Sequence, residues 1–191
     1  MATLVIVLRA VSLLAFAGPM LLMVSGRGGK PRTRARQNDG GRAPMVANLA
    51  AFGLFFLSLL MFSGNSEAPM ALPLALLGCL LGLAGAGLVV RSRAELGPAW
   101  SLVPRADQDM GLVTTGPYRL VRHPIYLGLA LLAMGEALAF NSWPAVLIVL
   151  SGIVPTFAWR ARAEEELLSR TFDERYALYR KQTKMIIPHL L

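Results

Sequence analysis

The sequence is poor in the residue types that form cross-links, bind transition metals or keep a soluble protein hydrated. Its 191 residues include one cysteine, Cys79, and two histidines, His123 and His189. An intrachain disulfide or a cysteine-based zinc site is therefore excluded, and we predict no metal centre. Only 16% of the residues are charged and 55% are hydrophobic, whereas soluble domains are about a quarter charged. This composition favours an integral membrane protein with one compact helical unit.

Signals of nucleotide or nucleic-acid binding are also missing. The segment GRGGK at 26–30 lacks the spacing and the Ser/Thr of a phosphate-binding loop, and no strand-borne GxGxxG occurs. The net charge of +8 lies mainly between apolar runs, where membrane topology would place it. We therefore expect no nucleic-acid partner, and we interpret 25–44 as a basic, glycine-rich linker that can touch anionic membrane lipids.

What the chain does have is long apolar runs. They span roughly 2–24, 45–63, 69–90, 124–140 and 142–159, and about 20 residues suffice to cross a hydrocarbon core. We predict an all-α, polytopic membrane bundle of about five transmembrane helices, followed by a cytoplasmic C-terminal helix. Small residues four apart in the third run predict a face for close helix packing: Gly78, Gly82 and Ala86.

The distribution of cations predicts the orientation. Lysine and arginine gather in segments 25–44, 91–123 and the tail from Arg160, whereas the short connections at 64–68 and 141 carry none. The positive-inside rule then places the N-terminus outside and the C-terminus in the cytoplasm. Residues 1–90 would form three transmembrane helices with a cytoplasmic loop at 25–44. Residues 91–191 would add two more and the C-terminal helix, within one structural unit.

The segment GPYRLVRHPIYLG, residues 116–128, brings cations and aromatic side chains to the start of the fourth run. Pro124 suits the first residue of a helix, where its missing N–H costs nothing. His123 would then lie at the cap, where free backbone N–H groups suit an anion. Tyr126, three residues on, could face the same cleft. The same residues could instead form an ordinary interfacial belt.

The segment from Arg160 to Pro188 predicts a helix that continues from the fifth run. Arg160 and Glu164 have the spacing of a surface ion pair, and apolar positions recur at three and four residues: Leu168, Phe172, Tyr176 and Tyr179. A solvated amphipathic helix on the membrane surface would explain this pattern. However, charges at the bilayer boundary are costly unless they are paired or used.

Glu136 and Arg9 are charged residues inside apolar runs. Glu136 could reach outward to solvent or pair with Arg9. A buried pair of this kind would also fit a second class of protein, a non-catalytic membrane subunit or a small transporter.

Several motifs in order resemble one family. They are LGPAWS, LVTTGPYRLVRHPIYLG, RARAEEELL and FDERYALYRK, within about residues 94–188. Together they resemble the isoprenylcysteine carboxyl methyltransferase family, and the related phospholipid methyltransferases share this C-terminal layout. Residues 1–90 match only as generic apolar helices. Asp173 departs from the pattern, because the family usually has glycine there.

The resemblance implies an enzyme that uses S-adenosyl-L-methionine and releases S-adenosyl-L-homocysteine, with a lipophilic substrate entering from the bilayer. Arg160 would hold the substrate carboxylate, and Glu165 would act beside it as the second catalytic residue. The positions that match the family's cofactor-binding motifs are Tyr118, His123, Pro124, Tyr126, Gly128, Glu164 and Glu165. The implied location is the bacterial inner membrane, with the active site facing the cytoplasm.

The acceptor is left open by the residues. A carboxylate is already an anionic nucleophile, so the protein needs only to align it with the methyl group. An amine, as in phosphatidylethanolamine, would need a base, and His123 or Glu165 would be the candidates. We expect O-methylation of an isoprenylcysteine-like carboxylate. Phospholipid N-methylation or methylation of a small thiol are the alternatives, and the sequence does not identify the oligomeric state.

Overall fold

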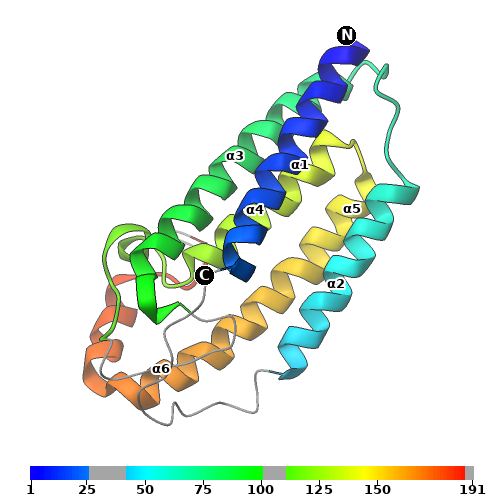
Figure 1. The fold of residues 1–191 in the computed structure, drawn as a ribbon. Helices are drawn as coiled ribbons and strands as arrows, with labels where there is room; N and C mark the ends of the chain where they lie inside the picture. The colour runs from blue at the N-terminus through cyan, green and yellow to red at the C-terminus, as the bar shows by residue number, and fades with distance from the viewer. Residues whose placement is uncertain (26–41, 101–110, 188–191) are drawn as a thin grey trace.

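The computed structural model describes residues 1–25, 42–100 and 111–187, and these ranges form a bundle of helices (Figure 1). The long elements are α1 (Ala2–Ser25), α2 (Arg42–Met61), α3 (Ala71–Leu96), α4 (Pro124–Ala139), α5 (Trp143–Ile148) and α6 (Val154–Gln182). The short ones are η2 (Gly97–Ala99), η4 (Gly116–Arg119) and the π-helical turn η5 (Val149–Ile153). The described residues contain no strand beyond one isolated bridge, between Val121 and Lys184. The prediction of an all-α bundle is confirmed.

Four of the helical segments are long and apolar enough to cross a membrane: Ala2–Met23, Ala43–Met61, Ala71–Leu96 and Trp143–Gln182. The last is a helical segment of 40 residues that joins α5, η5 and α6 without a loop between them. The fifth predicted helix, α4, has 16 residues, which is about 24 Å of helix against a core of about 30 Å. It can be short because most of its surface is buried by neighbouring helices rather than exposed to lipid.

The connections predicted to share one membrane side meet at one end of the bundle. The N–H of Gly64, after α2, donates to the carbonyl of Phe140, after α4, at 2.9 Å. Asn141 makes the tight turn into α5 with a φ of 51°. The N-terminus lies at this end, and the C-terminal part of α6 lies at the other (Figure 1). The N-out, C-in orientation and the division of the chain at residue 90 stay predictions.

Glycines let α3 and α4 approach closely. A Cβ at Gly78 would lie 2.4 Å from the carbonyl oxygen of Gly135, and one at Gly135 would lie 2.8 Å from the nitrogen of Gly82. About two turns towards the other end, a Cβ at Gly85 would lie 2.6 Å from the carbonyl oxygen of Gly128. These separations are too short for any side chain, so the packing face predicted from Gly78 and Gly82 is confirmed.

The remaining helices pack on either side of this pair. α1 lies along α3 and α4, whereas α2 packs against α5, η5 and α6. Phe16 of α1 meets Phe56 of α2 edge-to-face, with ring centroids 5.4 Å apart. The two sides therefore share one apolar core, which also contains Phe55, Leu132 and Ile153.

Arg9 and Glu136 do not pair with each other, so the alternative in which Glu136 pairs with Arg9 is wrong, and its burial also contradicts the alternative in which it reaches solvent. The Arg9 guanidinium donates to the carbonyls of Ala139 and Gly64, both at 2.9 Å. Glu136 is 1% exposed and accepts a hydrogen bond from the Ser12 hydroxyl at 3.2 Å. Arg9 therefore satisfies one carbonyl at the end of α4 and one after α2, and a transporter built on a buried Arg9–Glu136 pair loses its structural basis.

The predicted C-terminal helix is present, but it bends. α6 continues to Gln182 with one non-helical residue, Asp173, which has a φ of 42° and a ψ of −119°. This is the backbone region that favours glycine, and it coincides with the position where the resembling family has glycine. The departure noted in the sequence thus lies at the bend itself.

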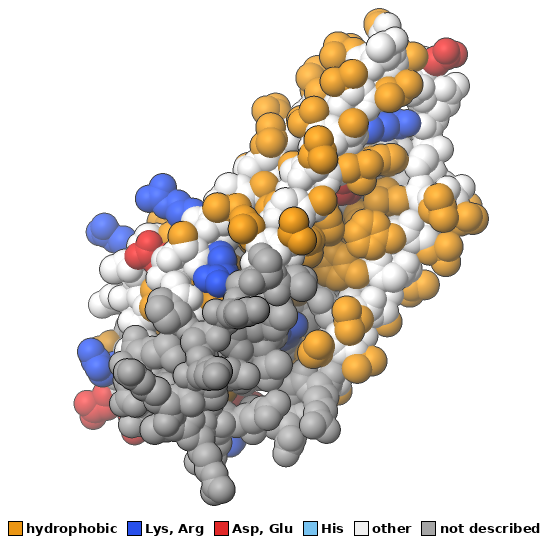
Figure 2. Space-filling view, in the orientation of Figure 1, with side chains coloured by type: hydrophobic (Ala, Val, Ile, Leu, Met, Phe, Trp, Pro, Cys, Tyr) orange, Lys and Arg blue, Asp and Glu red, His pale blue; other side chains and the backbone are white. Residues whose placement is uncertain are grey.

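Side-chain types are sorted along the bundle (Figure 2). Hydrophobic side chains cover most of the helical surface in this view, and charged side chains gather near the end that contains the C-terminal part of α6. The described residues include only the edges of the predicted basic linker at 25–44, and His189 also lies outside them.

Candidate active site

The backbone around His123 is held by the segment that follows α6. The N–H of Arg122 donates to the carbonyl of Lys184 at 2.8 Å, and that of His123 donates to Met185 at 2.9 Å. Met185 and Ile186 are buried in the core, which anchors this returning segment. α4 then begins at Pro124 with His123 as its N-cap, as predicted.

The imidazole of His123 lies between two carboxylates of α6. Its Nδ1 is 3.6 Å from Glu164 Oε2, and its Nε2 is 3.6 Å from Glu165 Oε1. Burial by itself lowers the pKa of His123, but the two carboxylates outweigh burial and hold its pKa above the ordinary value. The ring also stacks on Tyr126, with centroids 5.6 Å apart. His123 is therefore favoured in its protonated form.

Glu165 pairs with two arginines and does not itself line the cavity. Its Oε1 lies 2.6 Å from Arg122 Nε, and its Oε2 lies 3.7 Å from Arg180 Nε. Arg122 also donates to the carbonyl of Thr183, at the start of the returning segment. Glu165 thus connects α6, the RHP segment and the chain after α6, and it holds Arg122 and His123 in position.

Glu164 faces the other way, towards Tyr126 and Arg160. The Tyr126 hydroxyl donates to Glu164, and Arg160 Nε lies 3.4 Å from the same carboxylate oxygen. The Arg160 guanidinium lies over the Tyr126 ring, 5.7 Å from its centroid, and Tyr126 stacks on Phe157. Residues 157, 160 and 164 share one face of α6 because they are three and four apart.

Trp100 and Tyr118 reach the site from the connection between α3 and α4. Arg93 lies 5.3 Å from the Trp100 ring centroid and donates to the carbonyl of Gly97 at 3.2 Å. The Tyr179 hydroxyl donates to the carbonyl of Tyr118 at 2.6 Å. Cation–π and hydrogen-bond contacts therefore tie both ends of this connection to helices.

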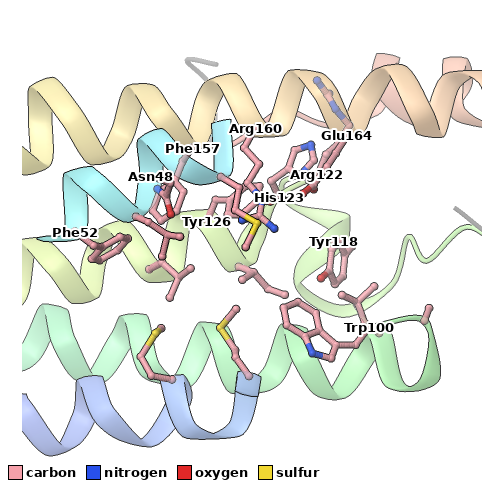
Figure 3. A pocket seen from close by; sticks show the side chains of 18 of the residues that line it. Asn48, Phe52, Trp100, Tyr118, Arg122, His123, Tyr126, Phe157, Arg160 and Glu164 are labelled. Atoms are coloured by element: carbon pink, nitrogen blue, oxygen red, sulfur yellow. Dashed lines mark hydrogen bonds and ion pairs between the residues drawn. The ribbon is translucent and has the colours of Figure 1, made fainter. Parts of the chain in front are cut away.

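These residues surround a cavity of about 540 Å³, within the size range of small-molecule sites. Its charged and aromatic end is formed by Trp100, Tyr118, Arg122, His123, Tyr126, Arg160 and Glu164. Its apolar walls come largely from α1 and α2: Phe16, Met20, Met23, Met45, Leu49, Phe52 and Phe56. Figure 3 shows Arg160 between these ends, with Glu164 on one side and Phe157, Asn48 and Phe52 on the other.

The predicted site residues divide into two groups. Five line the cavity: Tyr118, His123, Tyr126, Arg160 and Glu164. Pro124 starts the helix behind them, and Glu165 supports His123 from outside. Gly128 faces α3, since a Cβ there would lie 2.7 Å from Val89 Cγ2 and 2.9 Å from the Gly85 carbonyl oxygen. The structure thus gives Gly128 a role in helix packing.

Three cavity residues with polar side-chain atoms were missing from the sequence prediction, besides the apolar walls: Asn48, Trp100 and Arg122. Arg122 and Trp100 stand inside quoted motifs, RHP and LGPAW, so the motifs themselves were the available signal. Asn48 lies in the second apolar run, outside the region of resemblance. Its only signal was one amide in an otherwise apolar stretch.

The chain matches one known family and several known proteins. The sequence model of the phospholipid methyltransferase family matches residues 74–175. A protein-S-isoprenylcysteine O-methyltransferase of Schizosaccharomyces pombe is 31% identical over 56% of this chain and 48% of its own length. The cobalt-zinc-cadmium resistance protein CzcN of Cupriavidus metallidurans is 33% identical over 71% of this chain and 60% of its own. The chain thus spans about half the length of the curated relatives it matches.

The fold also matches a solved structure. The eukaryotic intramembrane Ras methyltransferase, an isoprenylcysteine carboxyl methyltransferase, aligns with a TM-score of 0.52. The alignment covers 99% of this chain and 74% of that one, at 18% sequence identity. The chain therefore belongs to the phospholipid methyltransferase family and has the membrane helical fold of an isoprenylcysteine carboxyl methyltransferase.

Proposed function

We propose that the protein is an S-adenosyl-L-methionine-dependent methyltransferase that methylates the carboxylate of a lipophilic, isoprenylcysteine-like acceptor. One observation carries the proposal. A single cavity joins apolar walls from α1 and α2 to an end that holds Arg160, Glu164, His123 and aromatic rings. An acceptor with an apolar tail and an anionic head matches both ends, and Arg160 lies where they meet.

The charged end fits the chemistry of the donor. S-adenosyl-L-methionine carries an ammonium, a carboxylate, ribose hydroxyls and an adenine, and when bound it supplies a methyl group activated on a sulfonium. Glu164 can accept hydrogen bonds from the ammonium or hydroxyls, and Arg122 and His123 can hold the carboxylate. The faces of Tyr118 and Trp100 can contact the adenine or the sulfonium. The residues present therefore suit this cofactor, with S-adenosyl-L-homocysteine as the product.

Arg160 supplies what a carboxylate acceptor needs. A guanidinium binds a carboxylate through two parallel hydrogen bonds, and this orients one oxygen lone pair for in-line attack on a methyl carbon. Glu164 and the Tyr126 ring hold the guanidinium in place. No proton has to be removed from the acceptor, so the site works without a general base.

The state of His123 and Glu165 argues against an amine acceptor. His123 is favoured as the protonated form by two neighbouring carboxylates, and Glu165 is occupied by Arg122. Neither group is free to take a proton from an ammonium, which N-methylation of phosphatidylethanolamine would require. The yeast relatives are named for O-methylation of isoprenylcysteine, in agreement with a carboxylate acceptor.

The apolar walls of the cavity belong to helices that can cross the membrane. The helices α1 and α2 that form the apolar walls are themselves candidate membrane spans, so a lipophilic acceptor can reach the cavity from the bilayer. The cations near the site end favour the cytoplasmic side by the positive-inside rule. A bacterial inner membrane is the location that we infer for this arrangement.

An acceptor panel tests the proposal. Purified protein in lipid–detergent micelles would receive methyl-labelled S-adenosyl-L-methionine with a farnesylcysteine derivative, phosphatidylethanolamine or a lipophilic thiol. We expect base-labile label, the property of a methyl ester, with the farnesylcysteine derivative only. Label in the phospholipid or the thiol would show that the enzyme methylates that acceptor instead of a carboxylate. Transfer to none of them, by folded protein, would contradict the proposed activity.

A further inference from the structure

One polar side chain stands among the apolar walls of the cavity. Asn48 of α2 is 8% exposed and lines the cavity, and its lining neighbours on α2 are apolar: Met45, Leu49, Phe52 and Phe56. A buried amide costs free energy unless its polar atoms find partners. An apolar residue would suit a wall that only had to accommodate a lipid tail, so the amide requires another explanation.

The orientation of the amide is set by hydrogen bonds across α2 and α6. The hydroxyl of Thr156 donates to the carbonyl of Ile153 at 2.9 Å, so its oxygen is left to accept. It accepts from Asn48 Nδ2 at 3.0 Å. This arrangement fixes which end of the amide is which. Among the described residues, Asn48 Oδ1 has no hydrogen-bond partner, and the residue lines the cavity.

The amide lies close to the position inferred for the reactive head of the acceptor. Thr156, its anchor, comes one turn before Arg160 on the same face of α6, about 6 Å along the helix axis. Figure 3 shows Asn48 beside Phe157, on the side of Arg160 away from Glu164. An atom that binds Asn48 therefore lies between the carboxylate at Arg160 and the apolar tail.

We propose that Asn48 is a specificity residue whose Oδ1 accepts a hydrogen bond from an N–H group of the acceptor, next to the carboxylate held by Arg160. In an acylated, S-alkylated cysteine, an amide N–H sits on the carbon that bears the carboxylate, which is this position. The enzyme would then distinguish an acceptor with a backbone amide from a simple lipophilic acid. The inference rests on the proposed function and names the acceptor class more narrowly.

Two acceptors that differ only in the acetamido group that carries this N–H provide the test. N-acetyl-S-farnesylcysteine carries the N–H, and S-farnesylthiopropionate lacks it but keeps the tail and the carboxylate. The measured quantity is the ratio of kcat/KM for the two acceptors, in wild type and in Asn48→Leu. The loss of one hydrogen bond, worth about 1 kcal/mol, should lower the ratio roughly fivefold in the variant.

Controls separate recognition from packing. Met45→Leu changes the same wall of α2 without a polar group, and Thr156→Val removes the link between α2 and α6 while keeping the amide. If Asn48 only joined the helices, all three variants would change both acceptors equally. Asn48→Asp keeps an acceptor oxygen at this position, so it should retain more of the ratio than Asn48→Leu, and it serves as a second variant if the leucine variant melts early.

The outcomes distinguish the inference from the function beneath it. An unchanged ratio in an active, folded Asn48→Leu protein overturns the role of Asn48 and leaves the methyltransferase proposal standing. A ratio that falls in Asn48→Leu and stays unchanged in Met45→Leu supports it, and a fall in Thr156→Val agrees with it, because that variant releases the orientation of the amide. If wild type methylates neither acceptor, the proposed function fails first and the role of Asn48 fails with it.

Discussion

The two ends of the bundle both contain buried charge, but they use it differently. At the end that contains the N-terminus and the turn into α5, Arg9 donates to backbone carbonyls, and Glu136 accepts from one hydroxyl through one of its two oxygens. At the other end, Arg160, Glu164 and His123 meet side chains from other elements around a cavity. None of Arg9, Ser12 and Glu136 lines that cavity. Buried charge marks a functional site only where it faces space that a ligand can occupy.

The largest predicted effect compares one residue from each end. Arg160→Ala should lower methyl transfer to a carboxylate acceptor by about 100-fold or more, since a buried charge pair is worth about 2–5 kcal/mol. Glu136→Gln should keep activity within about threefold, because its hydrogen bond from Ser12 can form to a neutral amide. Initial rates with labelled donor would measure both. If Glu136→Gln lost more activity than Arg160→Ala, the functional site would lie at the end of the bundle that contains Glu136.

The second comparison is between neighbouring glutamates of α6. Glu165→Gln leaves the largely buried Arg122 without its charge partner and should cost about 3 kcal/mol of folding stability. Glu166→Gln is the matched control, because Glu166 pairs with Arg170 at 3.9 Å where both side chains are about two-thirds exposed. Such a pair contributes about 0–1 kcal/mol. Thermal unfolding in one detergent would compare them, and equal losses would argue against the support role of Glu165.

The third prediction concerns pH at the site end. The pKa of His123 is raised in the folded protein, so its protonation contributes stability that is fully present below its unfolded pKa of about 6.5. That stability is lost as the pH rises through the folded pKa. The difference in melting temperature between wild type and His123→Gln should therefore shrink from pH 6 to pH 9. A difference that grows with pH would mean that the imidazole is neutral between Glu164 and Glu165.

The smallest effect is expected at the bend of α6. Asp173 adopts a φ of 42°, which a residue with a Cβ disfavours, so Asp173→Gly should stabilise the protein by about 0.5–1 kcal/mol. The gain is limited because glycine also increases the entropy of the unfolded chain. Glu174→Gly, one residue on within the helix, should instead destabilise by about 1 kcal/mol. A loss of stability in Asp173→Gly would contradict the strain at this residue.

The helices were largely predictable because apolar runs and helix-starting prolines act locally. Pro124 begins α4 as expected, and the 157–160–164 face follows from helix spacing. Glu164 and Glu165 show the limit. Both fell in one motif, but only Glu164 lines the cavity. The segment after α6 returns to Arg122 and holds the backbone of Arg122 and His123, so Glu164 and Glu165 lie on different sides of the imidazole. Residues distant in sequence fix that arrangement, and no local pattern encodes it.

Gly128 and Asn48 show two further limits. The resemblance associated Gly128 with the cofactor, whereas its missing side chain permits close contact with Gly85 and Val89 of α3. Asn48 lies outside the region of resemblance, and its importance depends on the rotation of α2 towards the cavity. A motif therefore identified most of the charged end, but it could not assign the role of each residue or reach the walls contributed by the first two helices.

Binding of S-adenosyl-L-methionine by calorimetry, with purified protein in lipid-supplied detergent, is the most direct test that this cavity is a methyltransferase site. We predict saturable binding that is weakened at least tenfold in Glu164→Gln and His123→Ala and is unchanged in the exposed control Glu166→Gln. Absence of binding to folded wild type, or equal binding by all the variants, would contradict the account.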